Sequence, residues 1–222
     1  SYGMSGWRSF RALLPGGSAQ SAEAANPVLQ FAMQDSLVLK TLFLVILAPL
    51  IEEFIFRKTL IDRMRPYGER LAVVTTALMF GLFHGNLSQM FYACTLGLVF
   101  GNVYVRTGKL RYTVGLHMLI NLLGGVVGPV LSDWAGPAVD AESLTVSELT
   151  PGAVALSVYS VLMIGAAIAG LVLLVIRAKH VTFRPTPLEL PRGKRFSTVW
   201  LNAGMLFFLL VCLLMVVGTF LT

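Results

Sequence analysis

The apolar run from Ala153 to Ile176 contains no charged side chain, and neither does the run from Val199 to Leu221. A helix needs about 20 mostly apolar residues to cross the hydrocarbon core of a bilayer, so both runs are long enough. Of the 222 residues, 56% are hydrophobic and only 13% are charged, too few charges to cover a water-exposed domain. The composition excludes a soluble globular enzyme, a disordered tail and a disulfide scaffold, and it indicates an integral membrane protein.

Four further apolar segments complete the predicted spans: Leu37–Arg57, Leu71–His84, Met90–Val105 and Tyr112–Leu131. None of the six segments alternates apolar and polar residues as the strands of a membrane barrel do. We therefore expect an all-α, polytopic transmembrane helix bundle of about six spans. This bundle would be a single domain over residues 37–222.

The first 36 residues are expected to lie outside the bundle. Trp7, Arg8 and Phe10 favour a short interfacial helix, whereas the linker Pro15–Pro27 favours an irregular loop, and both alternatives stay open for residues 1–36. The chain begins with Ser and has no recognisable signal peptide, which leaves room for further helices upstream.

Most of the Lys and Arg residues follow the first, third and fifth predicted spans, in the segments 57–70, 106–111 and 177–195. The other two connections, 85–89 and 132–151, contain neither Lys nor Arg. Basic loops remain on the cytoplasmic side of a membrane, so we expect these three segments to be cytoplasmic. The net charge of +6 thus favours anionic membrane lipids as partners, with no nucleic acid.

Ionisable side chains at bilayer depth are costly and are functional-site hypotheses by default. Glu52 and Glu53 are the only acidic residues within the predicted spans, and His84 and His117 are the only histidines there. Glu53 and Arg57 are four residues apart and share a helix face, which predicts an ion pair and leaves Glu52 free to point elsewhere.

Two more i,i+4 pairs lie on later spans. Phe80 shares a helix face with His84, and His117 shares one with Asn121. Each polar residue taken singly could form a simple interhelical hydrogen bond, and Phe80 alone would be read as core. Together, two acids, two histidines and an amide on three helices predict one buried, water-containing pocket.

A proline precedes the two acids. Pro49 has no backbone N–H, so it is expected to leave the carbonyl of Val45 without a partner and to kink the helix. Such a kink would open a polar cavity beside Glu52.

The three pairs together carry a family resemblance. Glu52-Glu53-x-x-x-Arg57, Phe80-x-x-x-His84 and His117-x-x-x-Asn121, in this order on successive hydrophobic segments, resemble the motifs of the CAAX-protease and bacteriocin-processing (Abi) family. That family includes the type II CAAX prenyl endopeptidase. The motif helices lie within residues 37–131, and the remainder of the chain resembles the family only in being hydrophobic.

The resemblance implies an intramembrane endopeptidase that cleaves near the C-terminus of a membrane-anchored protein or peptide. It implies that Glu52 and His84 activate the attacking water, that His117 and Asn121 form the oxyanion site, and that Glu53 and Arg57 support the structure. Many relatives are bacterial, so a bacterial or archaeal cell membrane is expected, and the substrate need not be prenylated.

No cofactor is expected, although zinc is the serious rival. Two histidines and a glutamate are a known catalytic zinc set, but the H-E-x-x-H motif is absent. Two other function classes stay open. The first is a non-catalytic relative that acts as a membrane regulator or bacteriocin-immunity protein. The second is a transporter or channel, which is disfavoured because the polar residues cluster at one depth.

Overall fold

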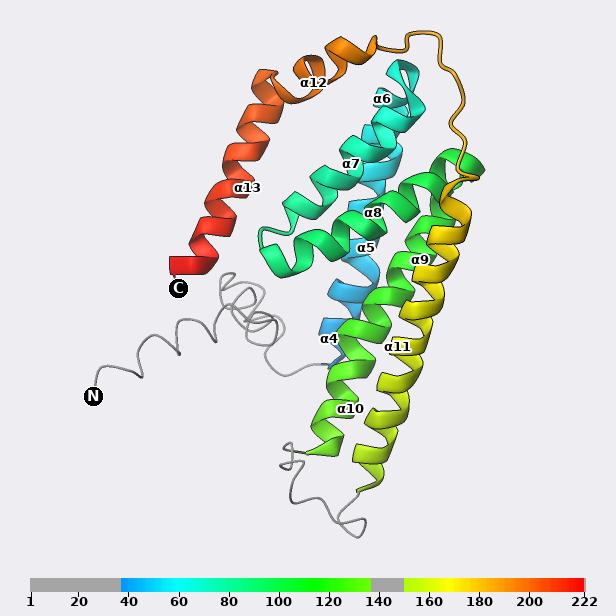
Figure 1. Ribbon diagram of the computed structural model, residues 1–222. Coiled ribbons are helices and arrows are strands. Elements are labelled where there is room, and N and C mark those ends of the chain that lie inside the picture. Colours follow the sequence, from blue (N-terminus) through cyan, green and yellow to red (C-terminus); the bar gives the residue numbers. More distant parts are fainter. Residues whose placement is uncertain (1–36, 137–149, 222) are drawn as a thin grey trace, which may run out of the picture.

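The protein is described by a computed structural model over residues 37–136 and 150–221; the predicted N-terminal segment 1–36 lies outside the described residues. Every regular element in the described part is a helix, which agrees with the all-α prediction (Figure 1). The helices stand roughly side by side, with α12 (Arg192–Trp200) lying across one end.

The first rod runs without interruption from Leu37 to Tyr67. It consists of α4 (Leu37–Lys40), η1 (Thr41–Leu47), α5 (Ala48–Glu53), η2 (Phe54–Ile61), α6 (Asp62–Met64) and η3 (Arg65–Tyr67). Both η1 and η2 are π-helical, so their turns are wider than those of an α-helix. The acids Glu52 and Glu53 lie between these two wide turns.

The next two helices, α7 (Glu69–Phe83) and α8 (Leu87–Thr107), form a tight antiparallel hairpin. Its turn contains Gly85, whose φ of 67° suits a residue without a side chain, and Asn86, whose Oδ1 accepts from the backbone N–H of Gln89 at 2.8 Å. The two backbones approach closely because glycine stands at the contact. A Cβ on Gly97 would lie 2.8 Å from the Cα of Ala77.

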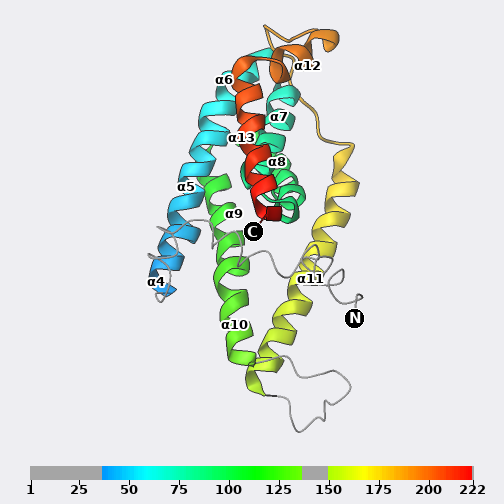
Figure 2. The same ribbon diagram turned by 90° about the vertical axis from the view of Figure 1, so that its left-hand side faces the viewer.

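A long helix and its neighbour form the other side of the molecule. The helix α9 (Leu110–Leu122) continues through the π-helical η4 (Leu123–Val127) into α10 (Gly128–Ala135). The helix α11 (Pro151–Ala178) packs along α10, and its Tyr159 hydroxyl donates to the carbonyl of Leu123 at 2.7 Å. In Figure 2, α13 (Ala203–Leu221) descends from α12 in front of α7 and α8.

The six predicted spans are helical, but six membrane crossings are not confirmed. Two helices are long and apolar enough to cross a bilayer, Leu110–Ala135 and Pro151–Arg177, and a third crossing results if α12 and α13, bent by 62°, form one span. The helix α7 has only 15 residues, which gives about 22 Å of helix. This is short of the roughly 30 Å of hydrocarbon in a bilayer.

The three basic segments meet at one end of the molecule, the upper end in Figure 1. Arg65 donates to the carbonyl of Val105 at 3.3 Å, and Arg106 donates to the carbonyl of Thr182. The backbone N–H of Leu188 donates to the carbonyl of Pro66 at 3.2 Å. The chain therefore gathers its positive charge at one end, as the charge pattern predicts; which side of the membrane this end faces stays a prediction.

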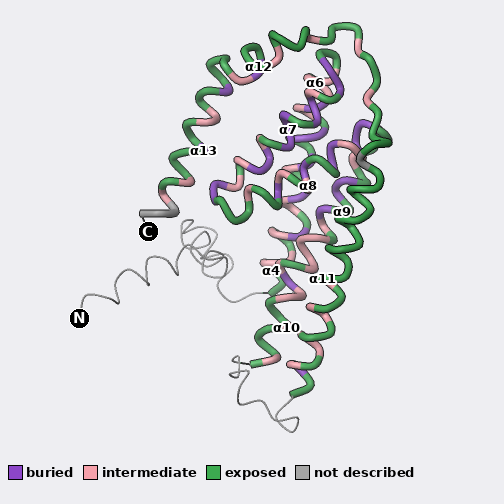
Figure 3. Tube along the Cα trace, viewed as in Figure 1, coloured by how far each residue is buried: buried purple, intermediate pink, exposed green. Residues whose placement is uncertain are grey.

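The buried core lies between the first rod and the α7–α8 hairpin. Its largest cluster contains Ile61, Ala72, Val73, Tyr104 and Val105. By contrast, α11 is exposed along nearly all of its length, as the green tube in Figure 3 shows. An apolar helix exposed in this way is suited to face lipid.

The hairpin contact gives a first test. Replacing Gly97 by valine should lower the unfolding temperature in detergent by several degrees, because the new Cβ meets backbone atoms of α7 that cannot rotate away. Gly165→Val, on the exposed face of α11 with open space around it, is the matched control and should change little. Equal unfolding temperatures for the two variants, measured by static light scattering, would contradict the packing described here.

Candidate active site

A buried ion pair lies at the centre of the bundle. Arg57 Nε donates to Glu53 Oε2 at 2.9 Å, and its Nη2 donates to Glu53 Oε1 at 3.3 Å, with both side chains 0% exposed. The i,i+4 pair predicted from the sequence is therefore present. A buried charge pair is stable only while both partners remain, because either one alone would be an uncompensated charge.

His117 joins this pair from α9. Its Nδ1 lies 3.1 Å from Glu53 Oε1, and since a carboxylate accepts, the Nδ1 proton points to Glu53. The opposite nitrogen, Nε2, lies 3.8 Å from Glu52 Oε2, too far for a hydrogen bond. Glu53 therefore fixes the orientation of the imidazole and turns its second nitrogen toward Glu52.

Of the two neighbouring acids Glu52 and Glu53, Glu52 has no hydrogen bond to the described residues. Its Oε2 is buried and has no partner there, although the side chain as a whole is 20% exposed. A buried carboxylate oxygen without a donor is costly and is normally satisfied by water or a ligand. Glu52 thus has the free acceptor that a water-activating base requires.

His84 ends α7, where the chain turns toward α8. Its Nδ1 donates to the carbonyl of Phe80, one helical turn earlier, at 2.7 Å. In the neutral ring this bond leaves Nε2 as the acceptor. The hydrogen bond therefore holds the half-buried His84 imidazole in one tautomer at the end of α7.

Phe80 brings the two histidines together. Its ring centroid lies 4.9 Å from that of His84 and 5.7 Å from that of His117, both edge-on. The Arg57 guanidinium carbon lies 4.9 Å from the centroid of the same ring. Phe80 is also 1% exposed and packs in the core against Phe56, so it is both a core residue and the contact among three motif side chains.

Asn121 is engaged with the first rod. Its Nδ2 donates to the carbonyl of Leu44 at 2.9 Å. In the π-helical turn η1, the carbonyl of residue i meets the N–H of residue i+5, and for Leu44 that residue is Pro49, which has none. The expectation that Pro49 frees the Val45 carbonyl is therefore wrong by one residue, because it assumes an α-helical turn.

Phe100 is a site residue that the sequence analysis does not identify. Its ring centroid lies 5.6 Å from that of His117 at a tilt of 36°, and the Arg57 guanidinium carbon lies 5.8 Å from its centre. The Arg57 guanidinium thus lies close to two aromatic rings, those of Phe80 and Phe100. The only sequence signal is that Phe100 stands between Gly97 and Gly101, the small residues that face α7.

Within residues 37–136 and 150–221, no three His, Cys, Asp or Glu side chains are grouped so that they could hold a metal ion. The cluster instead consists of one ion pair, two imidazoles, one unpaired carboxylate and one amide. These groups can accept a proton, donate hydrogen bonds and stabilise an oxyanion.

The comparison with known families bears on this part of the chain. Residues 34–123 match the family model described as type II CAAX prenyl endopeptidase Rce1-like. Over this segment the chain is similar to that family. No curated protein and no solved structure matches the chain. The match spans all three motifs and confirms the resemblance to the CAAX-protease family.

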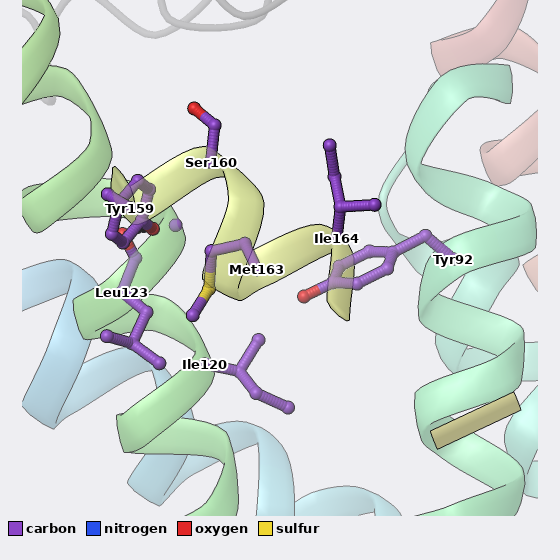
Figure 4. Close-up of a pocket in the computed structure, with 8 residues that line it drawn as sticks. Tyr92, Ile120, Leu123, Tyr159, Ser160, Met163 and Ile164 are labelled. Atoms are coloured by element: carbon purple, nitrogen blue, oxygen red, sulfur yellow. Dashed lines mark hydrogen bonds between the residues drawn. The ribbon is translucent and has the colours of Figure 1, made fainter. Parts of the chain in front are cut away.

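The matched family is one of endopeptidases, and the chain has helices that are long and apolar enough to cross a membrane. In this chain, the helices α8, α9 and α11 line a hollow of about 520 Å³, with Tyr92, Ile120 and Tyr159 among its lining residues (Figure 4). In Figure 4, Tyr92 reaches from α8 across this hollow toward α11. None of Glu52, His84 and Asn121 lines it, although Ile120 precedes Asn121 on α9.

The buried pair gives a second test. Arg57→Met should destabilise the protein by about 3–5 kcal/mol, because Glu53 would remain buried without its cation. Lys58→Met is the control: this neighbouring residue pairs with Asp62 at the surface, where ion pairs contribute little. Denaturant unfolding in detergent measures both variants, and an equal loss in the two would rule out the central role of the buried pair.

Proposed function

We propose that this Rce1-like protein is an intramembrane endopeptidase that hydrolyses a peptide bond of a membrane-anchored protein or peptide by direct attack of water. The observation that carries the proposal is the unpaired carboxylate of Glu52 beside the oriented imidazole of His117, within the segment that matches the family.

The water would be activated by Glu52 and His84. Glu52 Oε2 has no donor among the described residues, and the neutral His84 ring has an acceptor at Nε2. One of them removes a proton from water while the oxygen attacks the carbonyl carbon of the substrate. The same proton then passes to the leaving nitrogen as the C–N bond breaks, so that an acid and an amine are released.

The oxyanion would be held by His117 and Asn121. With a proton on both nitrogens, His117 can donate from Nε2 to the oxyanion while Nδ1 keeps its hydrogen bond to Glu53. Asn121 uses one N–H for the Leu44 carbonyl and has a second N–H to donate. The ion pair of Glu53 and Arg57 would hold His117 in place during the reaction.

The test is cleavage of a quenched fluorescent prenylated peptide by the protein in detergent, with the unprenylated peptide alongside. Glu52→Gln and His84→Ala should abolish detectable cleavage, and Asn121→Ala should lower kcat by about 10²–10³ because one oxyanion donor is lost. Asp133→Asn, the same change of acid to amide on an exposed position of α10, should cleave like the parent.

Two results would count against this mechanism. Cleavage by Glu52→Gln at the parental rate would remove the proposed base. A biological effect that survives Glu52→Ala while no peptide is cleaved would favour a non-catalytic membrane regulator or immunity protein. Cleavage of both peptides at equal rates would leave the mechanism intact and show that the substrate's lipid is not recognised.

Metal dependence is tested separately. We expect no loss of cleavage after treatment with a strong chelator such as 1,10-phenanthroline, because the proposed water is activated by Glu52 and His84 alone. Loss of cleavage that added zinc restores would replace this mechanism with a zinc mechanism.

A further inference from the structure

A second hollow lies at the basic end of the molecule, and none of the motif residues lines it. It has a volume of about 300 Å³ and lies between the first rod and α7 on one side and α12 and α13 on the other. Its walls are mostly apolar, with Leu60, Met64, Met79, Val199 and Met205 among them. In Figures 1 and 2 it corresponds to the region where α12 turns into α13 beside α7.

The bend between α12 and α13 lies at the wall of this hollow, which both helices line. The two helices meet at 62°. At the break, the side-chain amide of Asn202 bonds to the backbone of both flanking helices. Its Nδ2 donates to the carbonyl of Val199 at 2.8 Å, and its Oδ1 accepts from the N–H of Met205 at 3.0 Å. The most polar side chain in the wall is therefore satisfied, and the hollow offers an apolar surface to a ligand.

Exposed cations stand next to this apolar surface. Arg192 and Lys194 are exposed on α12, and in the described part of the chain neither side chain has a hydrogen bond or an ion pair. A third cation, Arg195, is paired within the protein. It donates to Glu189 at 2.7 Å and to the carbonyl of Leu190 at 2.9 Å, and the second bond holds Leu190 in the wall of the hollow.

The acids at this end are all neutralised. Asp62 pairs with Lys58 and accepts from the Tyr104 hydroxyl, Glu69 pairs with Arg65, and Glu189 pairs with Arg195. The described residues 57–70 and 177–195 therefore present an excess of positive charge. A ligand that complements the two surfaces together needs an anionic group joined to an apolar chain.

We infer that the hollow between α7 and α13 binds an acyl chain of an anionic phospholipid, with the lipid headgroup held by Arg192 and Lys194 of α12. A bilayer contains such molecules, with the anionic group at its surface and the acyl chain in its interior. Trp200 ends α12 beside the lining residues Val199 and Asn202, and tryptophan is commonly found between the headgroups and the hydrocarbon in membrane proteins. The inference does not depend on the proposed peptidase activity.

Trp200 also provides the probe. Replacing Trp7 and Trp134 by phenylalanine leaves it as the single tryptophan of the full chain. The protein is reconstituted in phosphatidylcholine bilayers that contain a small fraction of either dibrominated phosphatidylglycerol or dibrominated phosphatidylcholine. Bromine quenches fluorescence at short range, so selective binding should make phosphatidylglycerol quench Trp200 at a lower mole fraction than phosphatidylcholine does.

The charge is tested with Arg192→Gln/Lys194→Gln, which should weaken the preference for phosphatidylglycerol by about fivefold for each cation removed. Arg177→Gln/Lys179→Gln is the matched control, since it removes two exposed cations from the other end of the same connection. If both double variants lose the preference equally, the protein attracts anionic lipid only through its general surface charge and the inference is overturned.

The acyl chain is tested with Met205→Phe, which places a larger and stiffer side chain in the wall of the hollow and keeps every charge. It should weaken quenching by dibrominated phosphatidylglycerol several-fold. Glycerol phosphate, which has the anionic group without the chain, should fail to compete. Unchanged quenching in Met205→Phe, or full competition by glycerol phosphate, would show an anion site without an acyl chain and would refute the proposal. Equal quenching by the two brominated lipids would refute it as well.

Discussion

The organisation of this protein depends on one ion pair buried among apolar helices. Glu53 and Arg57 have no exposed surface, and each is costly without the other. Because Glu53 also accepts from His117, and because the rings of Phe80 and Phe100 lie close to Arg57, the pair joins α7, α8 and α9 to the first rod. Its charges are thus compensated by contacts that also orient the histidine.

The π-helical turns around Glu52 and Glu53 have a related consequence. Pro49 cannot donate to the carbonyl that faces it, and in the wide turn η1 this carbonyl is that of Leu44. Asn121 supplies the missing donor at 2.9 Å. The bond joins the last motif residue, Asn121 of α9, to the rod that carries the first, Glu52, so the wide turn of one helix becomes an attachment point for another.

Much of this could be predicted from the sequence, and the reasons for success and failure are physical. The pair of Glu53 and Arg57 was predictable because it depends only on helical spacing. The role of Phe100 was not, because an aromatic residue in an apolar helix has no local signal that separates it from ordinary core. The Leu44 carbonyl was missed because a π-turn shifts hydrogen bonding by one residue. The number of membrane crossings was not predictable because α7 is short and α12 bends away from α13.

The shortness of α7 has a consequence for the surrounding lipid. A helix of 15 residues whose basic end stays among the headgroups stops well before the opposite leaflet's surface. The turn at Gly85 and Asn86, with its polar backbone, would then lie at acyl-chain depth unless the leaflet deforms toward it. A dimple of this kind would thin the bilayer beside His84 and let water approach from the far leaflet. Under the proposed function, the length of α7 would then set how deep in the bilayer the substrate's peptide bond has to reach.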